Sequence, residues 1–338
     1  MTMSVIETSP STSRAARREL RTAGMLGYGC AQPSKIVTSE EIAARYDLTA
    51  DWIIERTGVE SRCVLDLDKG ETLLDLVVTA SRDALEVAGR SAEEVDTVIV
   101  ATITPDHLFP AESVALAAAI GVPQRAVVYD LSAACTGFVT ALGQAAGAVE
   151  SGRSELALVV GADALSRITP FDDPKGAPLF GDAAGAVVVG PVEHGGIGPI
   201  VAGYDHQHRI LFSDRDDDNV IRMRGRETYT HAVSRMSEVI LESLAQRGAT
   251  LDDVALLVPH QANIRIVRAV GEKLGIPSDR VSTQIADVGN TSAASIPFAL
   301  SREYKAGRLA DGGLIAMAGF GGGFVYSAIT VEIEGIAP

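Results

Sequence analysis

The sequence is poor in cysteine and has no long apolar run. Its three cysteines, Cys30, Cys63 and Cys135, have neither the spacing of a disulfide framework nor that of a zinc knuckle. We therefore expect a reducing compartment, by default the cytoplasm, and no metal site. No apolar stretch approaches the ~20 residues that span a bilayer, and no apolar signal segment follows the first residues. These absences predict a protein without a membrane partner.

Positive charge and aromatic side chains are also scarce. There are 29 Lys and Arg residues against 44 Asp and Glu, a net charge of −15 at pH 7, which argues against nucleic acid as a partner. An anionic ligand must then meet a local basic patch. Aromatic residues make up only 5% of the chain, whereas there are 33 glycines, a mixture that favours close packing of helices on sheets.

The chain is long enough for two fused domains or one large α/β unit. Helical and strand patterns alternate along it, as they do in α/β proteins. We expect a flexible N-terminal tail over residues 1–22 and not a transit peptide, because this stretch contains acidic residues and no arginine stripe. An N-terminal half over 23–192 and a C-terminal half over 193–338 are expected to follow.

The two predicted halves share an internal repeat. In each half a helix ends at glycine, and an acidic turn then leads into a strand. Further short matches follow in the same order. The last pairs Ser-Gly-Arg at 151–153 with Ala-Gly-Arg at 306–308, 155 residues later. Applied to Cys135, this offset predicts Asn290 as its counterpart at a second helix entrance.

Cys135 is the candidate nucleophile. It lies where an apolar strand, residues 126–129, is expected to pass into an alanine-rich helix. Unpaired N–H groups and the positive end of the helix dipole favour a thiolate at such an entrance. The alternative is an inert, buried cysteine, which is the more common role of this residue type.

His260 and Asn290 are the candidate partners of the cysteine. His260 follows a strand predicted over 254–258, at the edge where α/β sheets bind ligands, and Asn290 sits in a small-residue turn before a helix. Taken singly, each has an ordinary explanation: His260 as a core or helix-capping histidine and Asn290 as an N-cap. Together, with all three residues expected at carboxyl ends of core strands, they predict nucleophilic acyl transfer. The thiol would carry an acyl group as a thioester, and two neutral donors would hold an enolate oxygen.

A glycine run at 319–323 follows another predicted strand. It resembles a dinucleotide-binding fingerprint, but residues 325–332 predict a strand where that motif requires a helix. We expect the glycines instead to bring a backbone N–H close to a reacting carbonyl. That group would form an oxyanion hole together with the N–H of Cys135.

Two further features allow more than one interpretation. Trp52, the only tryptophan, is either a core aromatic or a flat stacking surface, with Arg56 one helical turn on to meet an anionic group. His206 and His208 lie near aspartates, but no fixed scaffold or fourth ligand is evident. We expect a hydrated loop there, and no metal.

Six stretches occur in the order found in one enzyme family. They are 51–58, 133–135, 180–186, 258–263, 289–294 and 320–324. On these motifs, which spread over residues 24–335, the chain resembles the β-ketoacyl-acyl-carrier-protein synthase III family of thiolase-fold condensing enzymes. The resemblance implies a thiolase-like α/β fold in which two duplicated βαβ-type halves give five layers, α-β-α-β-α. It also implies a reaction without a cofactor.

The resemblance implies a role for each site residue. Cys135 accepts the starter acyl group, and its N–H forms the oxyanion hole with that of Gly322. His260 and Asn290 hold the carbonyl of a malonyl thioester. The other implied positions are Trp52, Arg56, Thr57, Arg167 and Asn263 along the coenzyme A and pantetheine path, Phe109 and Tyr229 at the acyl pocket, and Arg265 and Arg268 for carrier-protein docking. Because Phe109 matches a residue that enters the partner's acyl pocket, a homodimer is implied.

Two stretches depart from the family pattern. Residues 203–219 lack the usual glycine-rich stretch. Glu272-Lys273 stands where a pair of lysines is common, so docking of an acidic carrier protein is expected to be weaker or directed to another partner.

Three hypotheses follow for the function. The leading one is a decarboxylative Claisen condensation in fatty-acid or polyketide initiation. In it an acyl-CoA charges Cys135, and malonyl-ACP or malonyl-CoA is decarboxylated and attacks the acyl group. The altered stretch 203–219 motivates the second, an ester- or amide-forming acyltransferase that uses the same acyl-cysteine. The third, a non-catalytic subunit that binds acyl chains, is disfavoured by the intact Cys135 and His260.

Overall fold

The structure is a computed structural model that describes residues 20–206, 209–216, 219–336 and 338. Most of the predicted tail, residues 1–19, and His208 of the proposed hydrated loop lie outside the described residues. Thr22, the last residue of that predicted tail, already begins a strand. The described residues form two five-stranded sheets, two small two-stranded ribbons and the helices that pack on them.

The first sheet is built from residues between Thr22 and Val192. Its strands, in order across the sheet, are β1 (Thr22–Ala31), β7 (Asp182–Val192), β6 (Ala157–Ala164), β4 (Thr97–Ala101) and β5 (Val127–Leu131). β4 runs parallel to both β5 and β6, with Val100 opposite Asp130 on one side and Val160 on the other. The carboxyl ends of these three strands therefore meet at one edge.

The second sheet follows in the chain. Its strands are β12 (Val254–Pro259), β13 (Gly313–Gly321) and β14 (Val325–Ile333), with β8 (Gly196–Ile197) and β9 (Val201–Tyr204) both paired to β14. β12 and β13 are parallel, with Val258 opposite Met317. The strand predicted after the glycine run is thus confirmed as β14.

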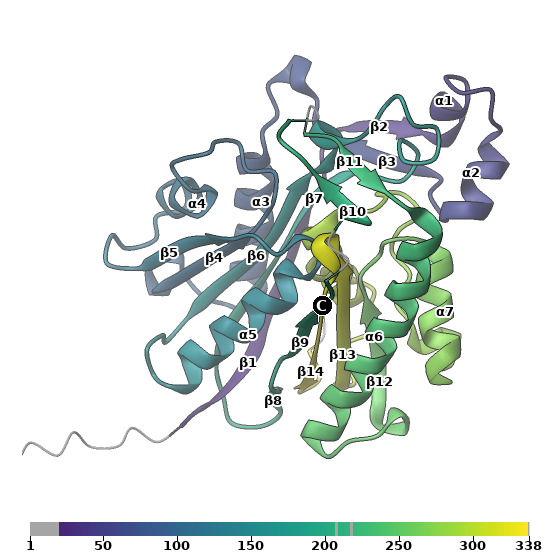
Figure 1. The fold of residues 1–338 in the computed structure, drawn as a ribbon. Coiled ribbons are helices and arrows are strands. Elements are labelled where there is room, and N and C mark those ends of the chain that lie inside the picture. Colours follow the sequence, from purple (N-terminus) through teal and green to yellow (C-terminus); the bar gives the residue numbers. More distant parts are fainter. Residues whose placement is uncertain (1–19, 207–208, 217–218, 337) are drawn as a thin grey trace, which may run out of the picture.

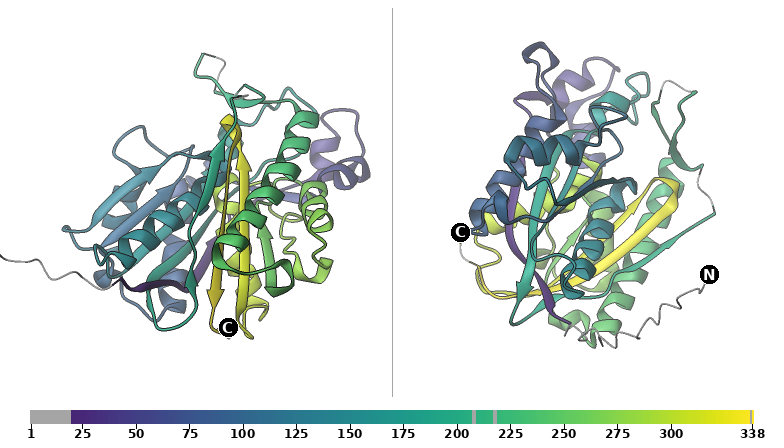
Figure 2. Two further views of the ribbon diagram at one scale, coloured as in Figure 1. Left: turned by 60° about the horizontal axis from the view of Figure 1, so that its bottom comes forward. Right: turned by 90° about the vertical axis from the view of Figure 1, so that its left-hand side faces the viewer.

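Helices form three layers around the two sheets (Figure 1). They are α3 (Leu73–Val87) and α4 (Glu112–Ile120) outside the first sheet, α5 (Gly137–Glu150) and α8 (Ser295–Lys305) between the sheets, and α6 (Gly225–Arg247) and α7 (Ile264–Leu274) outside the second. In the left view of Figure 2, the green helix α6 lies beyond the yellow strands β13 and β14 from the first sheet. The predicted five-layered α-β-α-β-α arrangement is confirmed.

Small residues let the central helices lie directly on the sheets. A Cβ atom on Gly161 of β6 would come 2.2 Å from the carbonyl oxygen of Ala293, and one on Gly185 of β7 would come 2.4 Å from the backbone nitrogen of Phe298. Neither position tolerates a side chain. Buried side chains of α5, α8 and both sheets form a shared core. The close packing of helices on sheets that the glycine-rich composition predicted is therefore present at these two glycines.

Short elements gather at one end of the molecule, at the top of Figure 1. They are β2 (Lys35–Thr38), α1 (Ser39–Ala43), α2 (Ala50–Thr57), β3 (Ser61–Val64), β10 (Leu211–Ser213) and β11 (Ile221–Met223). α1 begins with a capping box between Thr38 and Glu41, and α2 ends at Gly58 with a φ of +79°. Turns of 3₁₀-helix are η1 (Leu67–Lys69), η2 (Ala92–Glu94), η3 (Ala134–Thr136), η4 (Leu165–Ile168), η5 (Leu251–Asp253), η6 (Ser278–Arg280), η7 (Ser292–Ala294) and η8 (Gly322–Phe324). No described helix is both long and apolar enough to cross a membrane.

The two central helices begin in the same way. In the first half Ala134 has a positive φ of 46°, and η3 leads directly into α5. In the second half Ser292 has a positive φ of 50°, and η7 leads directly into α8. Positive φ is uncommon outside glycine, so its recurrence at the same step marks equivalent residues.

This equivalence corrects the predicted offset of the repeat. Ala134 and Ser292 are 158 residues apart, so the counterpart of Cys135 is Ala293. The sequence prediction, Asn290, used an offset of 155 taken from a later match. It was wrong because loops of different length separate the matched segments in the two halves, and the offset changes along the chain.

Candidate active site

One cavity of about 1350 Å³ opens at the end that carries α2, β10 and β11, and Cys135, His260 and Asn290 all line it. Cys135 follows β5 of the first sheet, and His260 follows β12 of the second. Within the described residues no strand ends at Asn290, which makes only an isolated bridge with Phe180. The predicted placement at strand ends therefore holds for two of the three residues, yet all three reach the same space.

Burial controls the protonation of the Cys135 thiol. It raises the pKa of this thiol to about 12. The Ser292 hydroxyl beside the sulfur lowers the pKa, Asp163 raises it, and the N–H groups of Cys135 and Gly322 lower it. The Ser292 hydroxyl falls short of full hydrogen-bond geometry with any partner. The thiol is protonated at neutral pH, which corrects the predicted thiolate: the helix entrance acts in the expected direction, but desolvation outweighs it.

The glycine run brings the end of β13 against the backbone of Cys135. A Cβ on Gly319 would come 2.8 Å from the carbonyl oxygen of Cys135, and one on Gly321 would come 2.8 Å from its nitrogen. Because glycine has only a hydrogen in place of Cβ, the two backbones can approach this closely. The N–H of the next residue, Gly322, then lies beside the cysteine sulfur. Two backbone N–H groups thus flank the thiol, which is the arrangement needed to receive an oxyanion.

His260 is a buried, neutral imidazole, 1% exposed. The backbone N–H of His260 donates to the carbonyl of Ala318 at 2.8 Å, which fixes the residue beside β13. Nδ1 lies 2.6 Å from Oγ of Ser295. Burial lowers the pKa of the ring to about 3, so at neutral pH the ring carries a single hydrogen and no charge.

The carboxamide of Asn290 is oriented by its own turn. Oδ1 accepts the N–H of Ser292 at 3.0 Å, so the oxygen faces the backbone and the NH₂ group is left for the cavity. The backbone of Asn290 is held by Leu179 and Gly181, with hydrogen bonds of 2.9 and 3.0 Å. The residue thus makes a cap-like bond and also lines the site.

Asp163 is a residue that the sequence prediction missed. It is the penultimate residue of β6 and is fully buried. Its Oδ1 accepts from Ile103 N–H at 2.8 Å and from the hydroxyls of Thr102 and Thr104 at 3.1 and 2.9 Å. Its Oδ2 accepts the N–H of Ala293 at 3.2 Å, which joins the two halves. Burial raises the pKa of this carboxyl group. The one sequence signal was a carboxylate at the end of an otherwise apolar strand.

Four of the residues expected along the coenzyme A path line the entrance on the α2 side. The guanidinium of Arg56 lies 4.4 Å from the ring centroid of Trp52 and forms a cation–π pair with it. The tryptophan also packs against α1, so both predicted roles of this residue apply. The hydroxyl of Thr57 donates to the carbonyl of Ile53 and accepts the N–H of Val59. Asn263 caps α7 and donates to the carbonyl of Arg56 at 2.9 Å, which ties α7 to α2.

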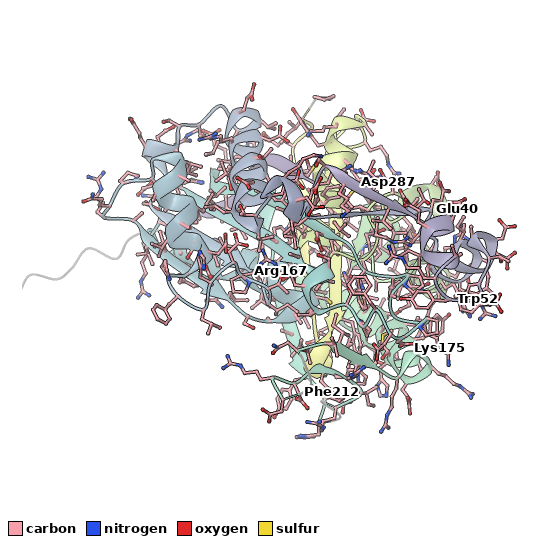
Figure 3. All side chains as sticks on the ribbon, turned by 90° about the horizontal axis from the view of Figure 1, so that it is seen from above. Glu40, Trp52, Arg167, Lys175, Phe212 and Asp287 are labelled. Atoms are coloured by element: carbon pink, nitrogen blue, oxygen red, sulfur yellow. The ribbon has the colours of Figure 1, made fainter. Side chains whose placement is uncertain are left out.

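Arg167, the fifth of these expected residues, also lines the cavity, but its guanidinium is bound to neighbouring groups. Its guanidinium binds the Asp106 carboxylate at 2.5 Å and the carbonyl of Thr104 at 3.0 Å. Figure 3 shows it well apart from Trp52, whereas the labelled Lys175 lies near Trp52 in that view. The segment before Lys175 is tied to this side of the molecule, because the Tyr46 hydroxyl donates to the carbonyl of Phe171. Arg167 therefore supports the wall of the cavity, whereas Lys175 and Arg56 are lining cations on the side of Trp52.

The remaining expected residues are divided between the cavity and the surface. Tyr229 of α6 lines the cavity, with the guanidinium of Arg265 5.7 Å from its ring centroid. Arg265 and Arg268 are exposed on α7. Phe109 is 85% exposed and does not line the cavity of its own chain.

The apolar wall of the cavity comes in part from β10, which lies in the stretch 203–219, and from β11, which follows that stretch. β10 and β11 contribute Leu211, Ile221 and Met223, which pack with Leu179 and Phe180. The hairpin therefore covers the space in front of the cysteine with apolar side chains. Among the described residues no three histidine, cysteine or acidic side chains gather as a metal site.

The fold and this site define a class of protein, the thiolase-fold enzymes that transfer acyl groups through a cysteine. Comparison with known proteins narrows the class. The family model for 3-oxoacyl-[acyl-carrier-protein] synthase III matches residues 129–205, and the model for its C-terminal part matches 244–333.

Similar proteins of known sequence extend over nearly the whole chain. The β-ketoacyl-[acyl-carrier-protein] synthase III of Geobacillus kaustophilus is 42% identical over 92% of this chain and 98% of its own. That of Erythrobacter litoralis is 39% identical over 92% and 99%. The chain belongs to the β-ketoacyl-[acyl-carrier-protein] synthase III family, and it is an acyl-transferring condensing enzyme.

Solved structures agree with this assignment. The 3-oxoacyl-(acyl carrier protein) synthase III of Pseudomonas aeruginosa PAO1 superposes with a TM-score of 0.88, at 38% identity, over 94% of this chain and 100% of that one. The priming β-ketosynthase of the R1128 polyketide pathway superposes with a TM-score of 0.89, at 38% identity, over 94% and 98%. The predicted thiolase-like fold and enzyme class are confirmed.

Proposed function

We propose that the protein condenses an acyl-CoA starter with a malonyl thioester by a ping-pong route in which Cys135 carries the acyl group. The observation that carries this proposal is the convergence of Cys135, His260 and Asn290 on one cavity, beside the N–H of Gly322. An acyl thioester that enters the cavity meets a nucleophile and an oxyanion hole. A malonyl thioester that follows it meets two neutral donors.

In the first half-reaction the sulfur of Cys135 attacks the carbonyl carbon of the acyl-CoA. As the new C–S bond forms, the carbonyl oxygen becomes an oxyanion, which the N–H groups of Cys135 and Gly322 receive. The oxyanion then collapses and the bond to the coenzyme A sulfur breaks. Coenzyme A leaves as a thiol with the proton that Cys135 carried. Because burial keeps that thiol protonated, attack and proton loss are coupled.

In the second half-reaction a malonyl thioester takes the place of coenzyme A. The Nε2–H of His260 and the NH₂ of Asn290 donate to its thioester carbonyl. When carbon dioxide leaves, the electron pair of the broken C–C bond is held as an enolate. The enolate carbon attacks the acyl group, a new C–C bond forms as the C–S bond breaks, and Cys135 departs as a thiolate that takes up one proton from the solvent. Since burial keeps the pKa of His260 at about 3, the ring acts as a neutral donor.

Delivery of the two substrates is assigned to the entrance and to α7. The Trp52–Arg56 pair and Lys175 are the groups proposed to hold the nucleotide of coenzyme A, supported by their place at the cavity mouth. Arg265 and Arg268 are exposed and offer positive charge on an otherwise acidic chain. A malonyl group delivered on acidic acyl carrier protein would dock there, and malonyl-CoA is the alternative extender.

We also propose a homodimer built on the edge of the first sheet. β5 is its outer strand, and Val127 and Tyr129 on this strand are exposed. Leu108 and Phe109 are each 85% exposed. An unpaired edge strand beside exposed apolar residues favours association. Joining two copies along β5 would direct Phe109 of the partner subunit toward the acyl cavity, and sedimentation analysis of the full chain tests the expected two-chain mass.

The rival functions have less support. The relatives that match over nearly the whole chain are named as condensing enzymes, which does not favour an ester- or amide-forming acyltransferase. One structural neighbour primes a polyketide pathway, so fatty-acid and polyketide initiation are both within the proposal. We propose no cofactor for either half-reaction. The three free thiols are in keeping with a cytoplasmic site of action.

Two measurements test the proposed function. Mass spectrometry of protein mixed with a panel of acyl-CoA starters should show one acyl adduct, located on the peptide that contains Cys135. Subsequent addition of malonyl-ACP or malonyl-CoA should remove the adduct and release carbon dioxide. Absence of any adduct across linear, branched and aromatic starters would contradict the proposal. So would transfer of the acyl group to an alcohol or amine without release of carbon dioxide.

A further inference from the structure

The first turn of α8 contacts the imidazole through Ser295. Oγ of Ser295 lies 2.6 Å from Nδ1 of His260, and both side chains are buried. The backbone N–H of Gln261 points at the same oxygen from 3.3 Å. The oxygen of Ser295 therefore stands between a ring nitrogen and a backbone N–H.

A count of hydrogens sets the direction of these two bonds. The N–H of Gln261 can only donate, so it occupies a lone pair of the Ser295 oxygen. For the hydroxyl hydrogen of Ser295, the described residues offer one acceptor, Nδ1 of His260. Were the ring hydrogen on Nδ1 instead, the hydroxyl hydrogen would be buried without an acceptor, which is costly. The hydroxyl therefore donates to Nδ1.

The state of the other ring nitrogen follows. Burial keeps the pKa of His260 at about 3, so at neutral pH the ring has one hydrogen to place. With Nδ1 acting as an acceptor, that hydrogen is on Nε2. His260 lines the cavity, and it offers a donor there in this tautomer, whereas the other tautomer would offer a lone pair.

We propose that Ser295 is a positioning residue, whose hydroxyl holds His260 in the tautomer that donates its Nε2–H to the malonyl carbonyl. The inference rests on the proposed function of His260 in the second half-reaction. Ser295 acts through the ring and is not itself placed at the substrate. Without the hydroxyl, a fraction of the rings would carry hydrogen on Nδ1 and would repel the developing enolate oxygen.

α8 supplies a matched control for this proposal. Ser301 lies on the same helix and is also buried, but its hydroxyl has no hydrogen-bond partner and it does not line the cavity. Ser301→Ala makes the same chemical change as Ser295→Ala in the same helix. A general effect of losing a buried hydroxyl from α8 would therefore appear in both variants.

The first experiment reads the tautomer directly. ¹H–¹⁵N spectra of histidine-labelled full-length protein at pH 7, with the His260 signals assigned by their loss in His260→Gln, should show hydrogen on Nε2 alone. Ser301→Ala should leave these signals unchanged, whereas Ser295→Ala should shift them toward a mixture of tautomers. Hydrogen on Nδ1 in the wild-type protein would overturn the proposal without recourse to any variant. An unchanged tautomer in folded Ser295→Ala would also overturn it.

The second experiment separates the two half-reactions. Ser295→Ala should slow release of carbon dioxide from the malonyl thioester by about 3- to 10-fold, in proportion to the fraction of rings with hydrogen on Nδ1, because those rings present no donor. The rate of acyl loading on Cys135 should change by less than about 2-fold. Equal losses in both half-reactions would mean a structural role and would overturn the proposal. A wild-type protein that fails to load Cys135 would contradict the proposed function, and the spectra would still decide the tautomer.

Discussion

The two central helices, α5 and α8, begin with backbone turns of the same conformation but contribute different groups to the site. The turn before α5 presents a thiol at Cys135, and the equivalent position before α8 is Ala293. The second turn instead holds other groups. The N–H of Ser292 orients Asn290, the N–H of Ala293 binds Asp163, and the hydroxyl of Ser295 contacts His260. Duplication supplied two helix entrances, of which one became the nucleophile site and the other its support.

The difference explains why the site needs both halves. A thiol that burial keeps protonated is a weak nucleophile, so the first half alone provides a point of attachment without activating it. The donors for decarboxylation come from the second half, together with the glycine run that supplies Gly322. Each half-reaction therefore draws on a different helix entrance, and variants on the two sides should fail in different steps.

The largest effect is expected from removal of the nucleophile. Cys135→Ala should lower condensation by at least about 10³-fold, because neither of the other two cysteines lines the cavity. Product formation from acyl-CoA and a malonyl thioester measures the loss. Cys30→Ala is the control and should retain wild-type turnover. Residual condensation within about tenfold of wild type would show that Cys135 does not carry the acyl group.

Variants on the α8 side should separate the half-reactions. His260→Ala or Asn290→Ala should slow malonyl decarboxylation by about 10²- to 10³-fold, the usual loss for one donor to a developing oxyanion. Acyl loading on Cys135, followed by mass spectrometry, should stay near the wild-type rate. If loading fell as far as decarboxylation in either variant, the division of labour between the two helix entrances would be refuted.

A smaller effect is expected at the contact between the glycine run and Cys135. Gly321→Ala puts a Cβ 2.8 Å from the nitrogen of Cys135, which must displace one backbone from the other. Acyl loading should fall by about 10- to 100-fold, because the oxyanion hole loses its geometry. Gly147→Ala is the matched control: it lies in α5 with no atom within 4 Å of the added Cβ and should load normally. Normal loading by folded Gly321→Ala would refute the assigned hole.

The neutral imidazole should also be visible in the pH dependence of stability. Burial lowers the pKa of His260 from 6.5 to about 3, so folding favours the neutral ring. This contribution is complete above pH 6.5 and is lost as the pH falls toward 3, at up to about 1.4 kcal/mol for each pH unit. Denaturant unfolding should show a shallower acid loss for His260→Gln, whereas the exposed His107→Gln should match wild type. Parallel curves for wild type and His260→Gln would contradict the assigned pKa.

The smallest effect concerns the entrance cations. Lys175→Ala should raise KM for acyl-CoA by about 3- to 10-fold, because an exposed charge contributes little more than this. Arg167→Ala should affect the melting temperature more than KM, since the guanidinium of Arg167 binds the Asp106 carboxylate and the carbonyl of Thr104. Steady-state kinetics with varied acyl-CoA measures KM for both variants, and thermal unfolding measures their melting temperatures. A large rise in KM for Arg167→Ala, with none for Lys175→Ala, would show that Arg167 and not Lys175 contacts the nucleotide.

Much of the fold was predictable because it depends on local patterns. Alternating helices and strands, the Thr38 and Gly58 helix ends and the strand after the glycine run all have short-range signals, and the structure has each of them. The repeat was also visible. Its offset at Cys135 was not, because backbone equivalence is set by φ at Ala134 and Ser292, which leaves no mark in residue type. The boundary between the halves at residue 192 stays a prediction.

The site was predictable in its reactive side chains and less so in what surrounds them. Cys135 and His260 have strand-end contexts that the sequence reveals. Asp163 looks like any residue at the end of a strand until the fold places it beside Ala293. Arg167 and Lys175 are only eight residues apart in the sequence, in a segment of little regular structure. No periodicity therefore indicates which of the two faces the entrance. The pKa of the thiol depends on burial by residues from both halves, which a linear sequence does not display.

The most direct test of the account is a crystal structure of the Cys135-acylated protein with a non-cleavable malonyl thioester analogue bound. The analogue's thioester carbonyl is expected to accept hydrogen bonds from Nε2 of His260 and the NH₂ of Asn290. The acyl oxygen on Cys135 should point at the N–H groups of Cys135 and Gly322. A malonyl carbonyl bound away from His260 and Asn290, or an acyl oxygen outside that pair of N–H groups, would contradict it.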